Sequence, residues 1–266
     1  MMTEALVVLV AASAAGIMLG RASRFRSYRV HARRVAEIVS SASAELGALR
    51  QRVPPTFAGR LACIDQVLPE TIFAELRRQA LGLVRPERSY IPTHKKGGTV
   101  AYESLFDDAP AIVALYHARE MQELISRIVG DRVMPTPISD QSSLSVLCYD
   151  KPGDHIGWHY DHNFYRGRHF TVLLPLLNEG RAAGGLSHAT LMARIEGCEA
   201  DIPTPPNTLI VFEGAKVHHK VTPILEGERR LVLSMTYCTD PRANALQGVA
   251  RRFKDIAFYG PRALWT

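Results

Sequence analysis

The stretch SLSVLCYDKPGDHIGWHYDHNFYRGRHFTVLLPLL, residues 143–177, decides the fold. It contains two short apolar runs, 143–149 and 169–177, separated by a polar segment rich in Gly, Asp and His. Similar apolar runs follow at 188–195, 208–214, 219–224 and 230–238. Because several short strands with regular turn signals are typical of a sandwich or barrel, this half of the chain is expected to be a β-sheet structure.

The sequence before residue 143 has the periodicity of helices. Apolar residues recur at helical spacing from Pro69 to Leu81, and proline suits the first turn of a helix. Two more helical patterns run from about Ala109 to Val129, and we expect them to pack on the sheet. Between these segments, a polar stretch with glycines at His94–Thr99 is interpreted as a loop. The predicted class is therefore mainly β with flanking helices (α+β).

The chain divides into four predicted segments. Pro54-Pro55 ends a basic segment of helical pattern, because proline removes a backbone donor and restricts its predecessor. We expect an N-terminal membrane anchor at 1–22, a basic helical linker at 23–56, the main domain at 57–240 and a helical tail at 241–266.

The first segment contains an uncharged apolar stretch, Ala5–Gly20. As a helix it would span about 24 Å, which is short for a bilayer but sufficient for a thin one. Arginines follow this stretch, so the positive-inside rule predicts a single-pass membrane protein with a cytoplasmic catalytic domain. A cleaved signal peptide or an organellar presequence is the alternative.

The formal charge of +6 comes largely from one short basic cluster. Its members are Arg21, Arg24, Arg26, Arg29, Arg33 and Arg34. Without that cluster the chain is close to neutral, so no nucleic-acid partner is expected.

A candidate metal site lies in the polar segment. Residues two apart in an extended chain project to the same face, so His159 and Asp161 can both reach one metal ion. A third ligand must come from elsewhere, and His218-His219 lies in a later apolar run. Two histidines and one carboxylate suit iron(II) that keeps open positions, whereas tetrahedral zinc favours more histidine or cysteine. Ten residues after His219, Arg229 could pair with a carboxylate through two parallel hydrogen bonds.

The order of these motifs resembles the 2-oxoglutarate/Fe(II) dioxygenase superfamily, particularly its prolyl-hydroxylase-like branch. The resemblance covers about residues 60 to 240. Its matching pieces are Tyr149 to Gly153, His159-Tyr160-Asp161, Thr171 to Asn178, Gly184-Gly185, His219-x-Val-x-Pro and Gly227-x-Arg229. It implies a double-stranded β-helix (jelly-roll) core and oxidative decarboxylation of 2-oxoglutarate to succinate and CO2, coupled to attack on a substrate C–H bond. It also implies O2 as cosubstrate and ascorbate as a candidate reductant.

Functional residues follow from this resemblance position by position. His159, Asp161 and His219 match the iron ligands, and no catalytic residue beyond them is predicted. Arg229 matches the residue that pairs with the 2-oxoglutarate carboxylate. Tyr149 and Thr171 match positions that line the cosubstrate pocket. There are departures from the family pattern: Pro175 lies where relatives often have tyrosine, and Leu231 where many have serine.

Two choices between neighbours stay open. The His-x-Val-x-Pro register favours His219 over His218. The Gly-x-Arg register favours Arg229 over Arg230, but strand alternation does not settle which arginine points inward.

We expect a membrane-anchored hydroxylase that acts on a protein side chain or a small molecule. The family's halogenases usually lack the carboxylate ligand, so Asp161 favours hydroxylation over halogenation. The alternatives are a cupin-type metal-binding barrel that does not use 2-oxoglutarate and a non-catalytic membrane-tethered binding module. Substrate determinants are expected in the loops 86–105 and 162–169.

Overall fold

The computed structural model describes residues 29–40, 45–83, 86–91 and 95–243. The strands are β1 (Leu61–Ile64), β2 (Glu87–Ile91), β3 (Lys95–Ala101), β4 (Met134–Pro135), β5 (Leu144–Tyr149), β6 (His155–His159), β7 (His169–Glu179), β8 (Leu191–Ile195), β9 (Cys198–Ile202), β10 (Leu209–Phe212), β11 (His218–Val221) and β12 (Arg229–Cys238). The helices are α2 (Glu70–Gly82), α3 (Tyr102–Asp108), α4 (Pro110–His117) and α5 (Arg119–Val129). Short 3-10 helices are η1 (Glu45–Gln51), η2 (Ala58–Arg60) and η3 (Ala183–Gly185), and residues 29–40 are also helical.

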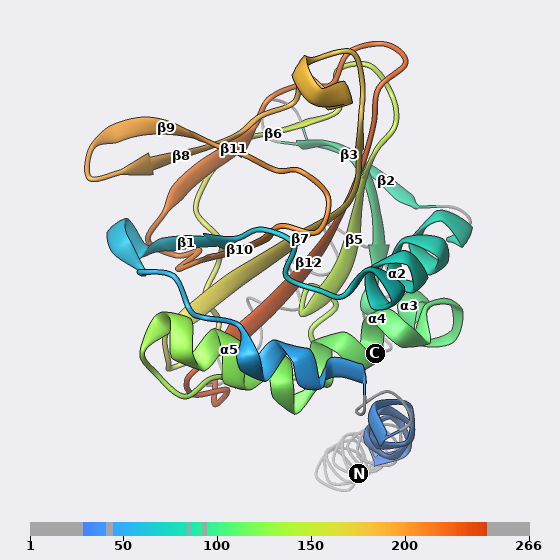
Figure 1. The fold of residues 1–266 in the computed structure, drawn as a ribbon, viewed down its shortest axis with the longest axis vertical. Coiled ribbons are helices and arrows are strands. Elements are labelled where there is room, and N and C mark those ends of the chain that lie inside the picture. The colour runs from blue at the N-terminus through green and yellow to red at the C-terminus, as the bar shows by residue number, and fades with distance from the viewer. Residues whose placement is uncertain (1–28, 41–44, 84–85, 92–94, 244–266) are drawn as a thin grey trace, which may run out of the picture.

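The strands form a curled antiparallel sheet with the order β1-β10-β7-β12-β5-β3-β6-β11-β8-β9. In Figure 1, strands β6, β11, β8 and β9 face β1, β10, β7 and β12 across the interior of the curl. This arrangement confirms the predicted jelly-roll core. β7 and β12 are the longest strands and pair along nearly their whole length. Their inner face borders the interior of the curl.

A first apolar core lies between the helices and the outer face of strands β7 and β12. Figure 1 shows α2 to α5 gathered on that side. The helices contribute residues such as Phe73 and Leu124, and the strands contribute alternate residues such as Leu233 and Met235. The hydroxyl of Tyr237 donates a hydrogen bond to the Tyr116 carbonyl at 2.7 Å and ties β12 to α4. The helical patterns predicted after Pro69 and over Ala109–Val129 are confirmed.

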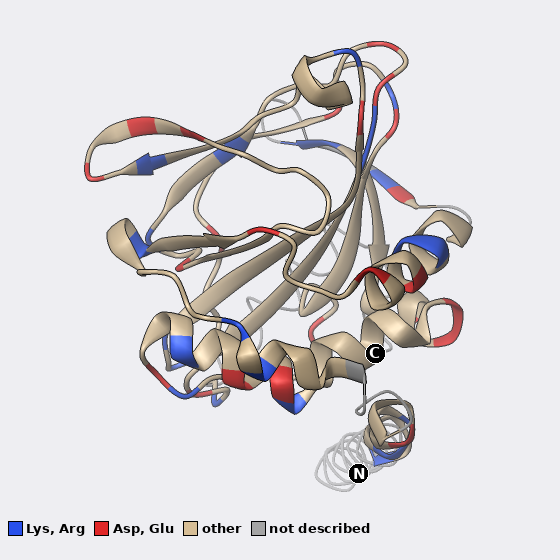
Figure 2. Cartoon of the chain, in the orientation of Figure 1, with Lys and Arg blue, Asp and Glu red and all other residues tan. Residues whose placement is uncertain are grey.

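A second apolar core fills the interior of the curl. It includes Leu173 on β7, Phe212 on β10, Leu191 on β8 and Val232 on β12. Figure 2 shows charged residues of both signs on helices, on turns and on strands β8, β9 and β11, whereas β7, β10 and β12 are mostly uncharged. The interior therefore offers a largely apolar chamber in which a few polar side chains stand out.

Pro175 interrupts the regular ladder of β7. The register with β12 shifts between Leu231, which pairs with Leu177, and Val232, which pairs with Pro175. Proline has no backbone N–H to give to a ladder, and a bulge is one of the few places where a central strand accepts it. This accounts locally for proline at a position where relatives often have tyrosine.

Two predictions about the first half of the chain are corrected. The stretch Lys95–Thr99 belongs to strand β3, and the interpretation of it as a loop is wrong. β3 pairs with β5 and with β6, so tertiary pairing outweighs the low strand preference of Lys and Gly. The segment 23–56, predicted as a linker, packs on the domain in its described part: Leu46 and Leu49 of η1 are buried in the first core.

The membrane prediction is also corrected. Within the described ranges, no helix has both the length and the apolar character needed to cross a bilayer. On this finding the predicted single-pass anchor with a cytoplasmic catalytic domain is wrong. The apolar stretch Ala5–Gly20 itself lies outside the described residues, as does the predicted helical tail from residue 244 onward. The domain boundaries at 22, 56 and 240 stay predictions.

Candidate metal centre and cosubstrate cavity

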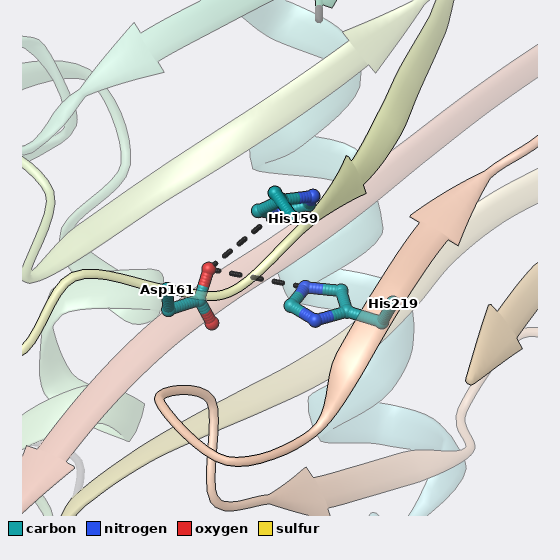
Figure 3. Close-up of side chains that lie close together, drawn as sticks. All are labelled: His159, Asp161 and His219. Atoms are coloured by element: carbon teal, nitrogen blue, oxygen red, sulfur yellow. Dashed lines mark ion pairs between the residues drawn. The ribbon is translucent and has the colours of Figure 1, made fainter. Parts of the chain in front are cut away.

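Three potential metal ligands meet at the edge of the chamber. His159 is the last residue of β6, Asp161 follows it by two, and His219 lies on the adjacent strand β11, where its Cα is the direct partner of His159. One ligand atom of each residue lies within 4.8 Å of the others. The Asp161 Oδ1 atom is 3.5 Å from His159 Nε2 and 3.8 Å from His219 Nε2 (Figure 3). The structure thus brings together the three residues predicted as iron ligands.

Backbone carbonyls set the orientation of both imidazoles. His159 Nδ1 lies 2.8 Å from the Gly157 carbonyl oxygen, and His219 Nδ1 lies 2.9 Å from that of Val217. A carbonyl oxygen can only accept a hydrogen bond, so each Nδ1 carries the proton. Each Nε2 then presents a lone pair to the common centre, which is the arrangement that metal-binding histidines adopt.

The Asp161 side chain is fixed from two sides. The Thr171 hydroxyl donates a hydrogen bond to Asp161 Oδ2, which leaves Oδ1 facing the histidines. The Asp161 backbone N–H donates to the Gly214 carbonyl at 3.0 Å. Burial alone would raise the pKa of Asp161, but His219, His159 and Thr171 more than offset it and bring that pKa well below its usual range. The carboxyl group is therefore ionised, as a metal ligand must be.

Gly214 is a residue of this site that the sequence analysis missed. A Cβ at this position would lie 2.3 Å from Asp161 Oδ2 and 2.6 Å from Thr171 Oγ1. Only glycine therefore allows the loop after β10 to approach the carboxylate so closely.

We expect Gly214→Ala to weaken Mn(II) or Fe(II) binding by about tenfold or more, in the range seen when groups that orient a metal ligand are lost. The reason is that a methyl group would displace Asp161 from Thr171. Isothermal titration with Mn(II) measures this. Gly82→Ala is the matched control, because a Cβ at Gly82 meets nothing within 4 Å. Unchanged metal affinity in Gly214→Ala would contradict this role.

The structure distinguishes the two neighbouring histidines, His218 and His219, by the face of β11 on which each lies. His219 is buried and faces the centre, whereas His218 points to the other face of β11. There the His218 ring stacks on Trp158 at 5.0 Å and on Tyr160 at 4.7 Å between ring centroids. The register that favoured His219 agrees with this geometry.

Of the two neighbouring arginines, Arg230 faces the cavity and Arg229 faces outward, which is the reverse of the prediction. Arg229 is exposed, and Arg230 is 1% exposed and lines the cavity next to the metal centre. The prediction that Arg229 is the inward residue is wrong for a physical reason: side chains alternate along β12, and Arg230 pairs with the inward-facing Tyr149. Alternation along β12 itself is the signal that was missed. Large apolar residues occupy 231, 233, 235 and 237, facing the helices, so the even positions face the cavity.

Arg230 is buried, and the part of the chain that the structure describes gives it no anionic partner. Its Nε and Nη1 atoms have no hydrogen-bond partner among the described residues. Its guanidinium carbon lies 5.8 Å from the centroid of the Tyr149 ring. Burial lowers the pKa of Arg230, and Tyr149 offsets this only in part. A buried cation with unused donors is costly, so this geometry fits an anion that enters the cavity.

The cavity has a volume of about 220 Å³ and connects Arg230 to the metal centre. Tyr149 and Thr171 line this cavity, and their predicted role at the cosubstrate stays a prediction. The Thr171 hydroxyl donates a hydrogen bond to Asp161 and so orients a candidate metal ligand. Lys95, Tyr160 and His162 also line the cavity. Lys95 was missed because its strand was interpreted as a loop.

Comparisons with known proteins agree with the fold. A family model for the 2OG-Fe(II) oxygenase superfamily matches residues 144–237, the segment that carries all three candidate ligands and Arg230. Over these residues the chain carries a 2OG-Fe(II) oxygenase domain. This domain indicates a 2-oxoglutarate-dependent dioxygenase, and iron and 2-oxoglutarate are the cofactor and cosubstrate that the matched family implies. A second family model, described as Halogenase D, matches residues 56–186. No curated protein sequence matches.

Solved oxygenase structures share the fold at low sequence identity. A prolyl hydroxylase from Trichoplax adhaerens, solved in complex with a hypoxia inducible factor peptide, aligns with a TM-score of 0.54 at 16% identity, covering 77% of this oxygenase and 91% of that chain. The epimerase SnoN from nogalamycin biosynthesis gives 0.55 at 15% identity, with 73% and 81% covered. An oxidoreductase of the 2OG-Fe(II) oxygenase family from Burkholderia pseudomallei gives 0.54 at 14%, with 70% and 88% covered.

Proposed function

We propose that this oxygenase hydroxylates its substrate, with His159, Asp161 and His219 holding iron(II) and Arg230 holding the distal carboxylate of 2-oxoglutarate. The observation that carries this proposal is the buried guanidinium of Arg230, whose Nε and Nη1 have no hydrogen-bond partner among the described residues, on the same cavity as the three candidate ligands. A cupin-type metal protein that does not use 2-oxoglutarate has no need of such a cation. The overall reaction consumes the substrate, O2 and 2-oxoglutarate and yields the hydroxylated substrate, succinate and CO2.

The residues of the chain have distinct tasks in this reaction. Iron(II), when bound, supplies the open coordination positions at which 2-oxoglutarate is oxidised and O2 is activated. Arg230 fixes the far end of the cosubstrate with two charge-assisted hydrogen bonds, so that its keto-acid end points to the metal centre. The apolar side chains of Leu173, Phe212 and Val232 line the path between the two ends and exclude water.

Halogenation is the second candidate, because the Halogenase D model also matches. Asp161 argues against it, since halogenases of the superfamily usually lack this carboxylate. In this oxygenase hydrogen bonds with Thr171 and Gly214 fix the orientation of Asp161. A carboxylate is therefore held at the position that halogenases usually leave without one. We therefore favour hydroxylation. Mass spectrometry of the product formed in the presence of chloride distinguishes a gain of one oxygen from a gain of one chlorine.

Metal removal provides the direct test of the proposed function. Protein treated with a chelator is expected to bind 2-oxoglutarate at least about tenfold more weakly than anaerobic Fe(II)-loaded protein, a loss of about 1.4 kcal/mol. The reason is that the keto-acid end of 2-oxoglutarate then has no metal to chelate. Calorimetry gives the affinities, and admission of O2 with candidate substrates should release succinate. Fe(II)-loaded protein that does not bind 2-oxoglutarate would refute the proposal.

A further inference from the structure

Two serine hydroxyls face the cavity from neighbouring strands. Ser145 lies on β5 and Ser234 on β12, and the two residues are direct partners across these strands. Both line the cavity, and Ser145 is 3% exposed. Direct partners in an antiparallel pair have Cβ atoms about 5 Å apart, so the two hydroxyls can bind one group of a ligand together.

The hydroxyls of this serine pair, Ser145 and Ser234, have no hydrogen-bond partner within the described ranges of the chain. Two other hydroxyls on the cavity wall are used: Thr171 donates to Asp161, and Thr236 Oγ1 lies 2.7 Å from the Oγ1 atom of a neighbouring threonine. A hydroxyl that is removed from water without a partner costs free energy. The contents of the cavity are therefore expected to supply the partner of the serine pair.

The serine pair lies at the metal end of the cavity. Along β12, the inward side chains after Arg230 are Val232 and then Ser234, whose backbone is about 13 Å from that of Arg230. On its other side Ser234 pairs with Leu173 of β7. Two residues from Leu173 is Thr171, whose hydroxyl orients a candidate metal ligand. A substrate that places a carbon at the metal centre therefore brings its neighbouring groups close to the serine pair.

The chemistry of the serine pair favours an uncharged polar group. One carboxylate of 2-oxoglutarate is assigned to Arg230 and the other to the metal, so both have charged partners. A serine hydroxyl has one donor and two acceptor positions and no charge. Two such hydroxyls match a group that both donates and accepts, such as a hydroxyl or a carboxamide. The apolar neighbours Leu147, Leu173 and Val232 offer a charged group no compensation for the water it would lose.

We propose that Ser145 and Ser234 together bind an uncharged hydroxyl or carboxamide of the substrate, next to the carbon that is oxidised. This inference rests on the proposed function and adds the substrate class. The two serines are specificity residues: a site that hydrogen-bonds a polar group discriminates against an analogue that lacks it, because the hydroxyls then stay without partners. The polar group can belong to a free small molecule or to a side chain of a polypeptide.

Acetamide and acetone are suitable probes because they have nearly the same size and shape, and only acetamide has an N–H donor. The protein is loaded with Mn(II), which accepts the same ligands as iron(II), and saturated with 2-oxoglutarate. Titration of each probe, followed by the paramagnetic relaxation of its methyl protons, gives its affinity near the metal. We expect wild type to bind acetamide about two- to tenfold more tightly than acetone, the value of one net hydrogen bond. Equal affinities overturn the inference.

The double variant Ser145→Ala/Ser234→Ala is expected to bind acetamide and acetone equally. Its affinity for Mn(II) should keep the wild-type value, which also shows that the variant is folded. Ser143→Ala is the matched control and should keep the preference for acetamide. Ser143 is equally buried, its Oγ also has no partner among the described residues, and it is not one of the described residues that line the cavity.

Two results with the double variant overturn the inference. One is a preference for acetamide that survives without the serine pair. The other is a loss of 2-oxoglutarate affinity while Mn(II) affinity is intact, because the serines would then serve the cosubstrate. Should the double variant lose Mn(II) affinity, the single variants Ser145→Ala and Ser234→Ala take its place, and each should lower the preference.

Failure of this inference differs from failure of the proposed function. If Mn(II)-loaded wild type does not bind 2-oxoglutarate, the proposed function itself fails. If 2-oxoglutarate binds but the probes show no dependence on the serine pair, only the substrate inference fails. The two sources of the polar group are separated by titration with propionamide and with a glutamine-containing tripeptide. Relaxation that depends on the serine pair for propionamide alone indicates a small molecule, and the same dependence for the peptide side chain indicates a polypeptide.

Discussion

Replacing His219 with alanine should lower the affinity for Mn(II) or Fe(II) about a hundredfold or more and abolish succinate formation. Loss of a residue that merely orients a ligand costs about ten- to a hundredfold, and His219 is itself one of the three candidate ligands. Its Nε2 lone pair faces Asp161, and no other described histidine besides His159 reaches that centre. Calorimetric titration of the purified variant with Mn(II) measures the effect.

His218→Ala is the matched control for this variant. It removes an imidazole one residue away, from a stack with Trp158 and Tyr160 on the other face of β11. Metal affinity is expected to stay at the wild-type value. Equal losses of affinity in the two variants would mean that the doublet acts through the stability of β11, and the assignment of His219 as a ligand would be lost.

Arg230→Met is expected to weaken 2-oxoglutarate binding without destabilising the ligand-free protein. Affinity for 2-oxoglutarate should fall by about 30- to 150-fold, or about 2 to 3 kcal/mol, because a charge-assisted pair is lost. The free energy of unfolding of the ligand-free protein should rise or stay equal, because methionine replaces a buried cation to which no described residue supplies an anionic partner. Calorimetry gives the first quantity and denaturant titration without metal or 2-oxoglutarate gives the second.

Arg229→Met tests the same charge on the exposed face of β12. The affinity for 2-oxoglutarate and the free energy of unfolding should both remain at the wild-type values, since exposed charges contribute little to either. If 2-oxoglutarate binding depended on Arg229 and tolerated Arg230→Met, the cavity would not be the cosubstrate site. A structural role for Arg230 would appear as a loss of stability in the ligand-free protein.

The sequence predicted the jelly-roll and the grouping of the three ligands because both depend on local patterns. Short apolar runs with turn residues between them indicate strands, and His159 and Asp161 share a face whatever the partner strand is. Histidine 219 followed from its register with Val221 and Pro223. These features need no knowledge of which strands are neighbours.

The errors occurred where strand pairing decides the outcome. Arg229 and Arg230 begin a strand after a turn, so alternation cannot be carried over from His219. The pattern within β12 and the pairing of Arg230 with Tyr149 together fix the inward residue. Lys95 was missed because Lys-Lys-Gly-Gly has little strand preference of its own, and β3 exists through its pairing with β5 and β6. Gly214 could not be found either, because its role is the space it leaves beside a carboxylate far away in sequence.

The direct pairing of His159 with His219 has a consequence for folding kinetics. The two residues are 60 positions apart in the chain, so the ladder between β6 and β11 closes a long loop, and such contacts are slow to form. A slip of β11 by one residue would turn His219 to the opposite face from His159, so a misregistered species cannot hold the ion with both imidazoles. A bound ion consequently stabilises only the correctly paired state. Where this pairing forms after the transition state for folding, the ion slows unfolding and leaves the refolding rate unchanged.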